Sequence, residues 1–207
     1  MRIELQDIGK KFTSEWVFRN VTFTFEERQA TAILGRNGSG KSTLLQIIAG
    51  NIHPTSGQVI CTLNGHPVPE DQRYRYLTLV APYQELIEEF SLPEMIKFHF
   101  AFKNFLPGFN LKKIIELLGF RDSGNKQIQQ FSSGIKQRVK LALAVCSDVP
   151  LILLDEPTLN FDAAGIEWYY KLMSEFAKDR TTLICSNQHQ TESIFAQSTL
   201  DIENFKP

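Results

Sequence analysis

The chain has 207 residues, of which 43% are hydrophobic, enough for one well-buried globular domain. Its 22 basic and 23 acidic residues give a net charge of −1, which offers no strong attraction for nucleic acid or an anionic membrane. The three cysteines lack the spacing of a metal site and favour reduced thiols in a cytosolic protein. We expect no secretory signal and no transmembrane helix, which would need about 18 to 20 apolar residues.

The order of apolar patterns along the chain predicts an α/β protein organised as one domain over residues 1–207. Short apolar or alternating runs predict strands, and longer runs with interleaved charges predict helices. Alternation of helix with unbroken apolar strand in the last third is typical of a buried, largely parallel sheet. The expected strands are 3–8, 21–25, 30–34, 58–63, 151–154 and 181–185. The expected helices are 41–50, 91–118 with a break at 107–108, 133–147 and 165–178.

A local run of basic residues stands out in the helix predicted at 133–147. Lys136, Arg138 and Lys140 recur at every second position. With the overall charge balanced, we expect them to form a solvated helix face.

A glycine-rich turn lies between the strand predicted at 30–34 and the helix that follows. Residues 35–42, GRNGSGKS, match the pattern GxxxxGK[ST] in full. Glycines let the backbone curl so that N–H groups point at phosphates, and the helix adds the positive end of its dipole. The alternative, an ordinary flexible turn, is disfavoured by the strand–loop–helix context. The expected phosphate-binding residues are Gly35, Asn37, Gly38, Ser39, Gly40, Lys41, Ser42 and Thr43, with Lys41 at the β/γ oxygens and Ser42 also on a metal.

A second anchor lies at residues 151–157, LILLDEP, an apolar strand that ends in two carboxylates. Sites of α/β proteins lie at the carboxyl ends of strands, so both acids can face a ligand. Asp155 is expected to hold Mg²⁺ through its water shell, and Glu156 to polarise the attacking water. The alternative is a strand end with solvated acids.

Between these anchors, residues 131–139, FSSGIKQRV, resemble the signature of the ATP-binding-cassette (ABC) family, usually LSGGQ followed by xxRV. The matching positions are Ser132, Gly134 and Arg138, and the departures are Phe131, Ser133 and Ile135. The resemblance implies that Ser132, Ser133 and Gly134 form an anion site for the γ-phosphate held by an opposite subunit. Taken alone, the segment is only a helix cap, with Ser132 or Ser133 as the N-cap.

Further positions are similar to motifs of the same family. Gln84, in residues 80–84, resembles the glutamine that senses metal and γ-phosphate, although a polar loop residue is the alternative. Asp162 matches the aspartate that ends the family's D-loop. Phe12 occupies the place of the aromatic that stacks on adenine in the family. The alternative is that Phe12 is a core residue on a strand face. Trp16 is a weaker candidate for stacking.

One departure concerns the histidine with which the family contacts the γ-phosphate. Aligned without a gap, residues 180–186 place Asn187 at that position, and His189 would need an insertion to replace it. We favour Asn187, an amide that can donate to a phosphate oxygen but cannot carry a proton or a charge. Slow hydrolysis is expected.

The resemblance extends over essentially the whole chain in motif order. It implies a RecA-like P-loop NTPase core with an antiparallel β-subdomain and an inserted α-helical subdomain at about residues 86–147. It also implies an ATPase that uses ATP and Mg²⁺, pairs head to tail with a second copy or another ABC subunit, and energises separately encoded membrane transporter subunits from the cytoplasmic face of the cell membrane. The alternatives are a soluble ABC ATPase outside transport and a weakly hydrolysing ATP-binding regulator. No nucleic-acid partner is expected.

Overall fold

The computed structural model describes residues 1–120, 126–186 and 192–206. The strands are β1 (Arg2–Phe12), β2 (Glu15–Phe25), β3 (Ala30–Leu34), β4 (Ser56–Leu63), β5 (His66–Pro67), β6 (Leu77–Val80), β7 (Leu151–Asp155), β8 (Thr181–Ser186) and β9 (Ser198–Asp201). The α-helices are α1 (Lys41–Ala49), α2 (Leu92–His99), α3 (Leu111–Leu117), α4 (Ser133–Val145) and α5 (Ala163–Phe176).

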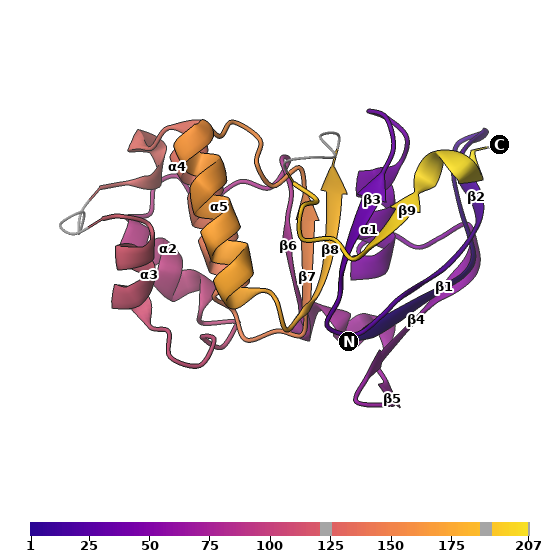
Figure 1. Ribbon diagram of the computed structural model, residues 1–207, viewed down its shortest axis with the longest axis horizontal. Helices are drawn as coiled ribbons and strands as arrows, with labels where there is room; N and C mark the ends of the chain where they lie inside the picture. The colour runs from indigo at the N-terminus through magenta and orange to yellow at the C-terminus, as the bar shows by residue number, and fades with distance from the viewer. Residues whose placement is uncertain (121–125, 187–191, 207) are drawn as a thin grey trace.

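The described residues form two β-sheets. One is five-stranded with the order β6-β7-β8-β3-β9, and its strand pairs are parallel. The other is four-stranded and antiparallel, with the order β2-β1-β4-β5. Helices α2, α3 and α4 gather at one end, the antiparallel sheet lies at the other, and the parallel sheet stands between them (Figure 1). This arrangement confirms the predicted α/β, P-loop NTPase fold class.

The register of the parallel sheet brings the ends of its strands to one edge. Leu34 lies opposite Ser186, Asp155 opposite Cys185, and Val80 opposite Leu154. Every residue of β7 and β8 is buried, because helices or the second sheet cover both faces. The turns that follow β3, β6 and β7 therefore start beside one another, at the edge where α/β proteins bind ligands.

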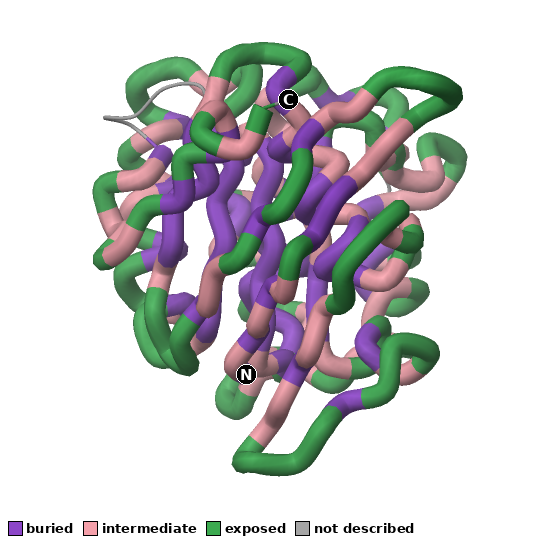
Figure 2. The backbone as a smooth tube through the Cα atoms, turned by 90° about the vertical axis from the view of Figure 1, so that its right-hand side faces the viewer, coloured by how far each residue is buried: buried purple, intermediate pink, exposed green. Residues whose placement is uncertain are grey.

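Burial is concentrated along the strands, while the connecting turns are exposed (Figure 2). One buried cluster joins both sheets through α1, with Ile3 and Phe25 from one sheet, Leu153 from the other and Leu44 from the helix. Each fully buried side chain of this kind contributes about 1.5–3 kcal/mol relative to exposure. The P-loop helix is thus packed between the two sheets.

Helix α4 is buried on two faces and joins the helical end to the parallel sheet. Its Leu141 and Val145 pack with β7 and α5, whereas Val139 and Leu143 pack with α2 and α3. A helix that contributes to two clusters cannot turn a broad face to water. Movement of α4 would therefore alter both regions.

The expectation of a solvated basic face on α4 is wrong, since all three basic side chains are half-buried. Lys136 pairs with Glu88, and Arg138 lies 3.8 Å from Asp162 Oδ1. Lys140 donates to backbone carbonyls in the turn after β6. These three side chains therefore connect α4 to neighbouring elements. They do not form a solvated face, because burial on two faces of the helix leaves little of its surface for water.

Strands β6 and β9 were not predicted, and the expected helical stretch 91–118 is interrupted over a longer segment than residues 107–108. In β9 only Leu200 is buried, so its sequence carries no clear alternation. Among the described residues, the helices are too short and too polar to cross a bilayer.

Candidate functional site

The turn between β3 and α1 forms a backbone cradle. Gly40, the N-cap of α1, has φ 104°, a left-handed conformation that side chains disfavour. A Cβ built at Gly40 would lie 2.5 Å from Val17 Cγ1, so the close approach of β2 also requires glycine. The first N–H groups of α1 thus face an open space of about 330 Å³, whose lining is Val17, Asn37, Gly38, Ser39, Gly40, Lys41, Ser42, Thr43 and Glu156.

Two side chains of this cradle are arranged as an anion site requires. Lys41 Nζ donates to Gly35 O at 2.7 Å and to Arg36 O at 3.0 Å, which curls the lysine back over the turn. Ser39 Oγ is buried and has no hydrogen-bond partner within the described residues. Ser39 Oγ packs inside the turn, since a Cβ built at Gly35 would lie 2.5 Å from it, and the positive charge at the turn comes from Lys41. The cradle therefore fits a nucleotide's phosphates.

Asp155, at the end of β7, lies next to the cradle and is hydrogen-bonded by the Ser42 side chain. Burial raises the pKa of Asp155, while the Ser42 hydrogen bond and the charge of Lys41 act in the opposite direction. A hydroxyl and a carboxylate side by side are ligands that Mg²⁺ uses in nucleotide sites. The pair fits a magnesium ion because a cation would stabilise the carboxylate that burial disfavours.

Glu156 also lines the open space at the start of α1. Its φ is 46°, a strained conformation for a residue with a side chain, and its N–H donates to Cys185 O at 3.0 Å. The hydrogen bond to β8 fixes the backbone at the point where the sheet ends. Strain held in place by neighbouring structure is typical of residues with a function.

The signature segment lies at the start of α4, and Ser132, Ser133 and Gly134 do not line the phosphate cradle. Ser132 is the N-cap, since its Oγ accepts from Ile135 N at 3.4 Å. Asp162 caps α5 by accepting from Gly165 N at 2.7 Å. The start of α4 thus has the geometry predicted for a helix cap, with Ser132 as the N-cap.

A family model described as "ABC transporter" matches residues 18–159. The chain belongs to the ABC transporter family. It is 27% identical to the "Uncharacterized ABC transporter ATP-binding protein YybJ" of Bacillus subtilis over 93% of this chain and 88% of the relative.

Solved structures agree with this assignment. A structure titled "ATP binding subunit of ABC transporter" shares 25% identity and a TM-score of 0.81, covering 97% of this chain and 85% of the other. The dimeric bacterial ABC transporter cassette MJ0796 matches with 22% identity and a TM-score of 0.79, over 97% of this chain and 94% of the other. The latter likeness supports the fold.

Two predicted contact residues of this ABC protein lie outside the lining of the cradle. Phe12 is 49% exposed at the end of β1, with Lys10 Nζ 4.9 Å from its ring centroid. Gln84 Oε1 accepts from Ala81 N within its own turn. Asn187 and His189 lie outside the described residues. The roles of these four residues stay predictions.

Two buried polar residues hold the segment after β7, and the sequence analysis assigned neither a role. Gln137 of α4 donates from Nε2 to Pro157 O at 2.9 Å. Glu192 accepts from Thr158, directly beyond that proline. Nothing in the sequence signals them, because each contact joins positions far apart in the chain.

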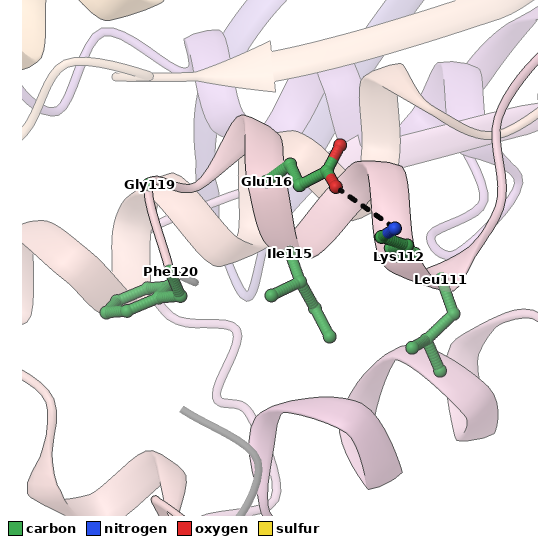
Figure 3. Close-up of a pocket in the computed structure, with 6 residues that line it drawn as sticks. All are labelled: Leu111, Lys112, Ile115, Glu116, Gly119 and Phe120. Atoms are coloured by element: carbon green, nitrogen blue, oxygen red, sulfur yellow. Dashed lines mark ion pairs between the residues drawn. The ribbon is translucent and has the colours of Figure 1, made fainter. Parts of the chain in front are cut away.

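A hollow of about 790 Å³ beside α3 belongs to no such site. Leu111, Ile115 and Phe120 extend into it, and Lys112 pairs with Glu116 on the same helix (Figure 3). An exposed i,i+4 ion pair over apolar side chains provides no convergent donors for a phosphate. The lining of this hollow therefore does not resemble a phosphate site.

Proposed function

We propose that this ABC protein binds Mg-ATP in the cradle between β3 and α1 and hydrolyses it to energise a membrane transporter. The observation that carries the proposal is the open space of about 330 Å³ at the start of α1, whose lining brings the glycine turn together with Lys41, Ser42 and Glu156. Asp155 and Glu156 add two carboxylates next to this anion site.

Each residue of the cradle has a distinct task in this proposal. The α1 N–H groups and Lys41 bind the phosphates, while Ser42 and Asp155 hold the cation. Magnesium, when bound, neutralises charge on the β- and γ-phosphates. Glu156 orients and polarises the water that attacks. Held by Cys185 O, it needs little rearrangement to do so.

The cassette is proposed to act as a head-to-tail pair, either of two copies or with another ABC subunit. The signature residues Ser132, Ser133 and Gly134 sit on α4, away from the lining of their own cradle. A second subunit would bring its signature to the γ-phosphate and complete the site. MJ0796, which shares the fold, is described as dimeric.

The membrane subunits are proposed to dock on a cavity of about 640 Å³ between β6 and the helical end, lined in part by Leu79, Met95 and Phe102. Phe102 is 74% exposed and its ring lies 5.4 Å from that of Phe98. Exposed aromatic side chains next to a cavity are typical of protein interfaces. This arrangement would place the protein on the inner face of the cell membrane.

The γ-phosphate switch residue is proposed to be Asn187, with His189 as the rival. An amide there would slow hydrolysis, which keeps a weakly hydrolysing regulator as a second candidate function. Phosphate release from the purified chain with Mg-ATP separates the two, since a weakly hydrolysing regulator would bind ATP with little turnover.

Transport is tested by purifying the tagged protein from membranes. Recovery of a multi-span membrane subunit in stoichiometric amount is the expected result. A chain that binds ATP tightly but is recovered only without membrane proteins would favour the soluble ABC ATPase.

A further inference from the structure

The turn after β6 lies beside the expected metal site. Val80 is opposite Leu154 in the parallel ladder, so the chain leaves β6 at the edge where Asp155 ends β7. Gln84 N donates to Ala81 O at 3.2 Å, which closes a tight turn directly beyond the strand. A side chain of this turn can therefore approach the nucleotide from the β6 side.

The Gln84 amide is already engaged within this turn. Its Oε1 accepts from Ala81 N at 3.1 Å, and Lys140 Nζ donates to Ala81 O and Gln84 O, each at 3.3 Å. Gln84 also lines the cavity between β6 and the helical end. The oxygen that would bind a metal is thus used to stabilise the turn.

The neighbouring Tyr83 is directed to the P-loop helix. Its Oη accepts a hydrogen bond from Gln46 Nε2, one helical turn beyond Ser42 on α1. Asn51 Nδ2 donates to Gln46 Oε1 at 2.7 Å, which fixes the amide with its N–H groups toward the phenol. Because Oη is the acceptor in this contact, its own proton is available to a further acceptor.

The charges nearby keep that proton on the phenol. Partial burial raises the pKa of Tyr83, the hydrogen bond from Gln46 opposes this, and the negative charge of Asp155 adds to the increase. A neutral phenol can donate to a phosphate oxygen but would not repel it. The ring is 54% exposed, so it can meet a ligand without disturbing the core.

We propose that Tyr83, rather than Gln84, is the residue of this turn that contacts the nucleotide, donating a hydrogen bond from Oη to the terminal phosphate of Mg-ATP. The inference rests on the proposed binding of ATP in the cradle. Tyr83 Oη contacts Gln46 of α1, one turn beyond Ser42, and the negative charge of Asp155 acts on the phenol, which places Tyr83 on the side where a cation would join the β- and γ-phosphates. Tyr83 therefore distinguishes ATP from ADP, because only ATP carries the acceptor.

The test compares the calorimetric affinities of a non-hydrolysable ATP analogue and of ADP, both with Mg²⁺. Tyr83→Phe removes only the hydroxyl, and the analogue should bind about ten- to a hundredfold more weakly, as expected for one hydrogen bond to a charged group. ADP affinity should stay within about twofold of wild type on the same scale. Tyr74→Phe is the matched control: Tyr74 is 60% exposed and its Oη accepts from Arg75 Nε at 3.1 Å, yet both affinities should be unchanged.

Three results would overturn the assignment: wild-type affinity for both nucleotides in Tyr83→Phe, equal loss for both, or an ATP-selective loss in Gln84→Ala alone. Lys41→Ala separates this inference from the proposed function. If Lys41→Ala binds ATP like wild type, the cradle itself is misassigned. If Lys41→Ala loses ATP and Tyr83→Phe does not, only the role of Tyr83 fails.

Discussion

Glu192 and Thr158 are joined by two hydrogen bonds in the interior of the protein. Glu192 Oε1 accepts from Thr158 N at 2.9 Å and from Thr158 Oγ1 at 2.7 Å, and both residues are buried. The Tyr169 hydroxyl donates to Glu192 O at 3.3 Å. The contact connects the chain after β8 to the segment that begins with Glu156, so it can fix the position of that carboxylate.

Glu192→Ala should destabilise the protein, because it leaves two buried Thr158 donors without their acceptor. The expected loss is about 1–3 kcal/mol in the free energy of unfolding, measured with urea. Glu192→Gln keeps an acceptor oxygen and should lose less. At a temperature where both variants are folded, the alanine variant should also show the lower kcat. Equal unfolding midpoints for wild type and both variants would contradict the structural role.

Lys41→Ala removes the mobile positive charge of the cradle and should weaken ATP binding by roughly ten- to a hundredfold, as a charge-assisted contact of about 1.5–3 kcal/mol implies. Calorimetry with Mg-ATP provides the measurement. Lys112→Ala, on the exposed face of α3, is the matched control and should bind normally. Wild-type affinity in Lys41→Ala would remove the cradle from nucleotide binding.

The cradle could be predicted from sequence because its residues are consecutive. Gly35 to Ser42 form one turn whose chemistry requires a fixed spacing, and Asp155 and Glu156 end an apolar strand. The predicted P-loop fold class was confirmed for the same reason: each motif carries its own local geometry. The assignment of each site residue to a task remains a prediction.

Two kinds of feature could not be predicted from the sequence. One is the contact between residues far apart in the chain, and the other is the short strand at the edge of a sheet. Glu192 meets Thr158 across 34 residues, and Tyr83 meets Gln46 across 37. Strand β6 has four residues and β9 has one buried residue, too few for a pattern to emerge. The sequence predicts a surface face for the basic residues of α4, because their partners come from other elements.

Asn187→His should raise steady-state ATP hydrolysis if Asn187 occupies the switch position. Imidazole is a larger donor with a second nitrogen, and a positioned group at a transferring phosphoryl contributes on the order of ten- to a thousandfold in rate. Phosphate release under saturating Mg-ATP measures the change. If His189→Ala abolishes hydrolysis while Asn187→Ala leaves it intact, His189 is the switch.

His99 should make the stability of the protein depend on pH. Its Nε2 lies 2.9 Å from Ser147 Oγ, and burial, with a smaller effect of Lys103, lowers the pKa of His99 to about 4. As the pH falls from about 6.5, the unfolded chain takes up a proton before the folded chain does. The stabilisation present at neutral pH is therefore lost between about pH 6.5 and 4, by at most about 3 kcal/mol.

Urea unfolding at several pH values tests this expectation. His99→Gln cannot titrate, although its amide can still donate to Ser147. The free energy of unfolding of the variant should fall less than that of wild type over the acidic window. Parallel profiles for the two proteins would show that His99 is not responsible.

Glu156→Gln should retain ATP but stop its cleavage. The amide has nearly the same size, and the cradle, Lys41 and Asp155 are untouched, so the phosphates and the cation keep their ligands. Only the carboxylate that polarises water is lost. With cleavage blocked, each ATP should remain between the cradle of one chain and the signature segment of the other. The bound ATP should therefore hold two chains together.

Size-exclusion chromatography with ATP and Mg²⁺ measures this pairing. Glu156→Gln should elute as a dimer with ATP and as a monomer without nucleotide, whereas Glu175→Gln, an exposed acid on α5, should behave like wild type. Adding Ser132→Arg to Glu156→Gln places a long cation at the start of α4, where the opposite γ-phosphate is expected, and should restore the monomer. A Glu156→Gln variant that hydrolyses ATP at the wild-type rate would exclude Glu156 from water activation. Because the double variant differs from Glu156→Gln only in the signature, loss of its dimer would locate the pairing surface at the start of α4.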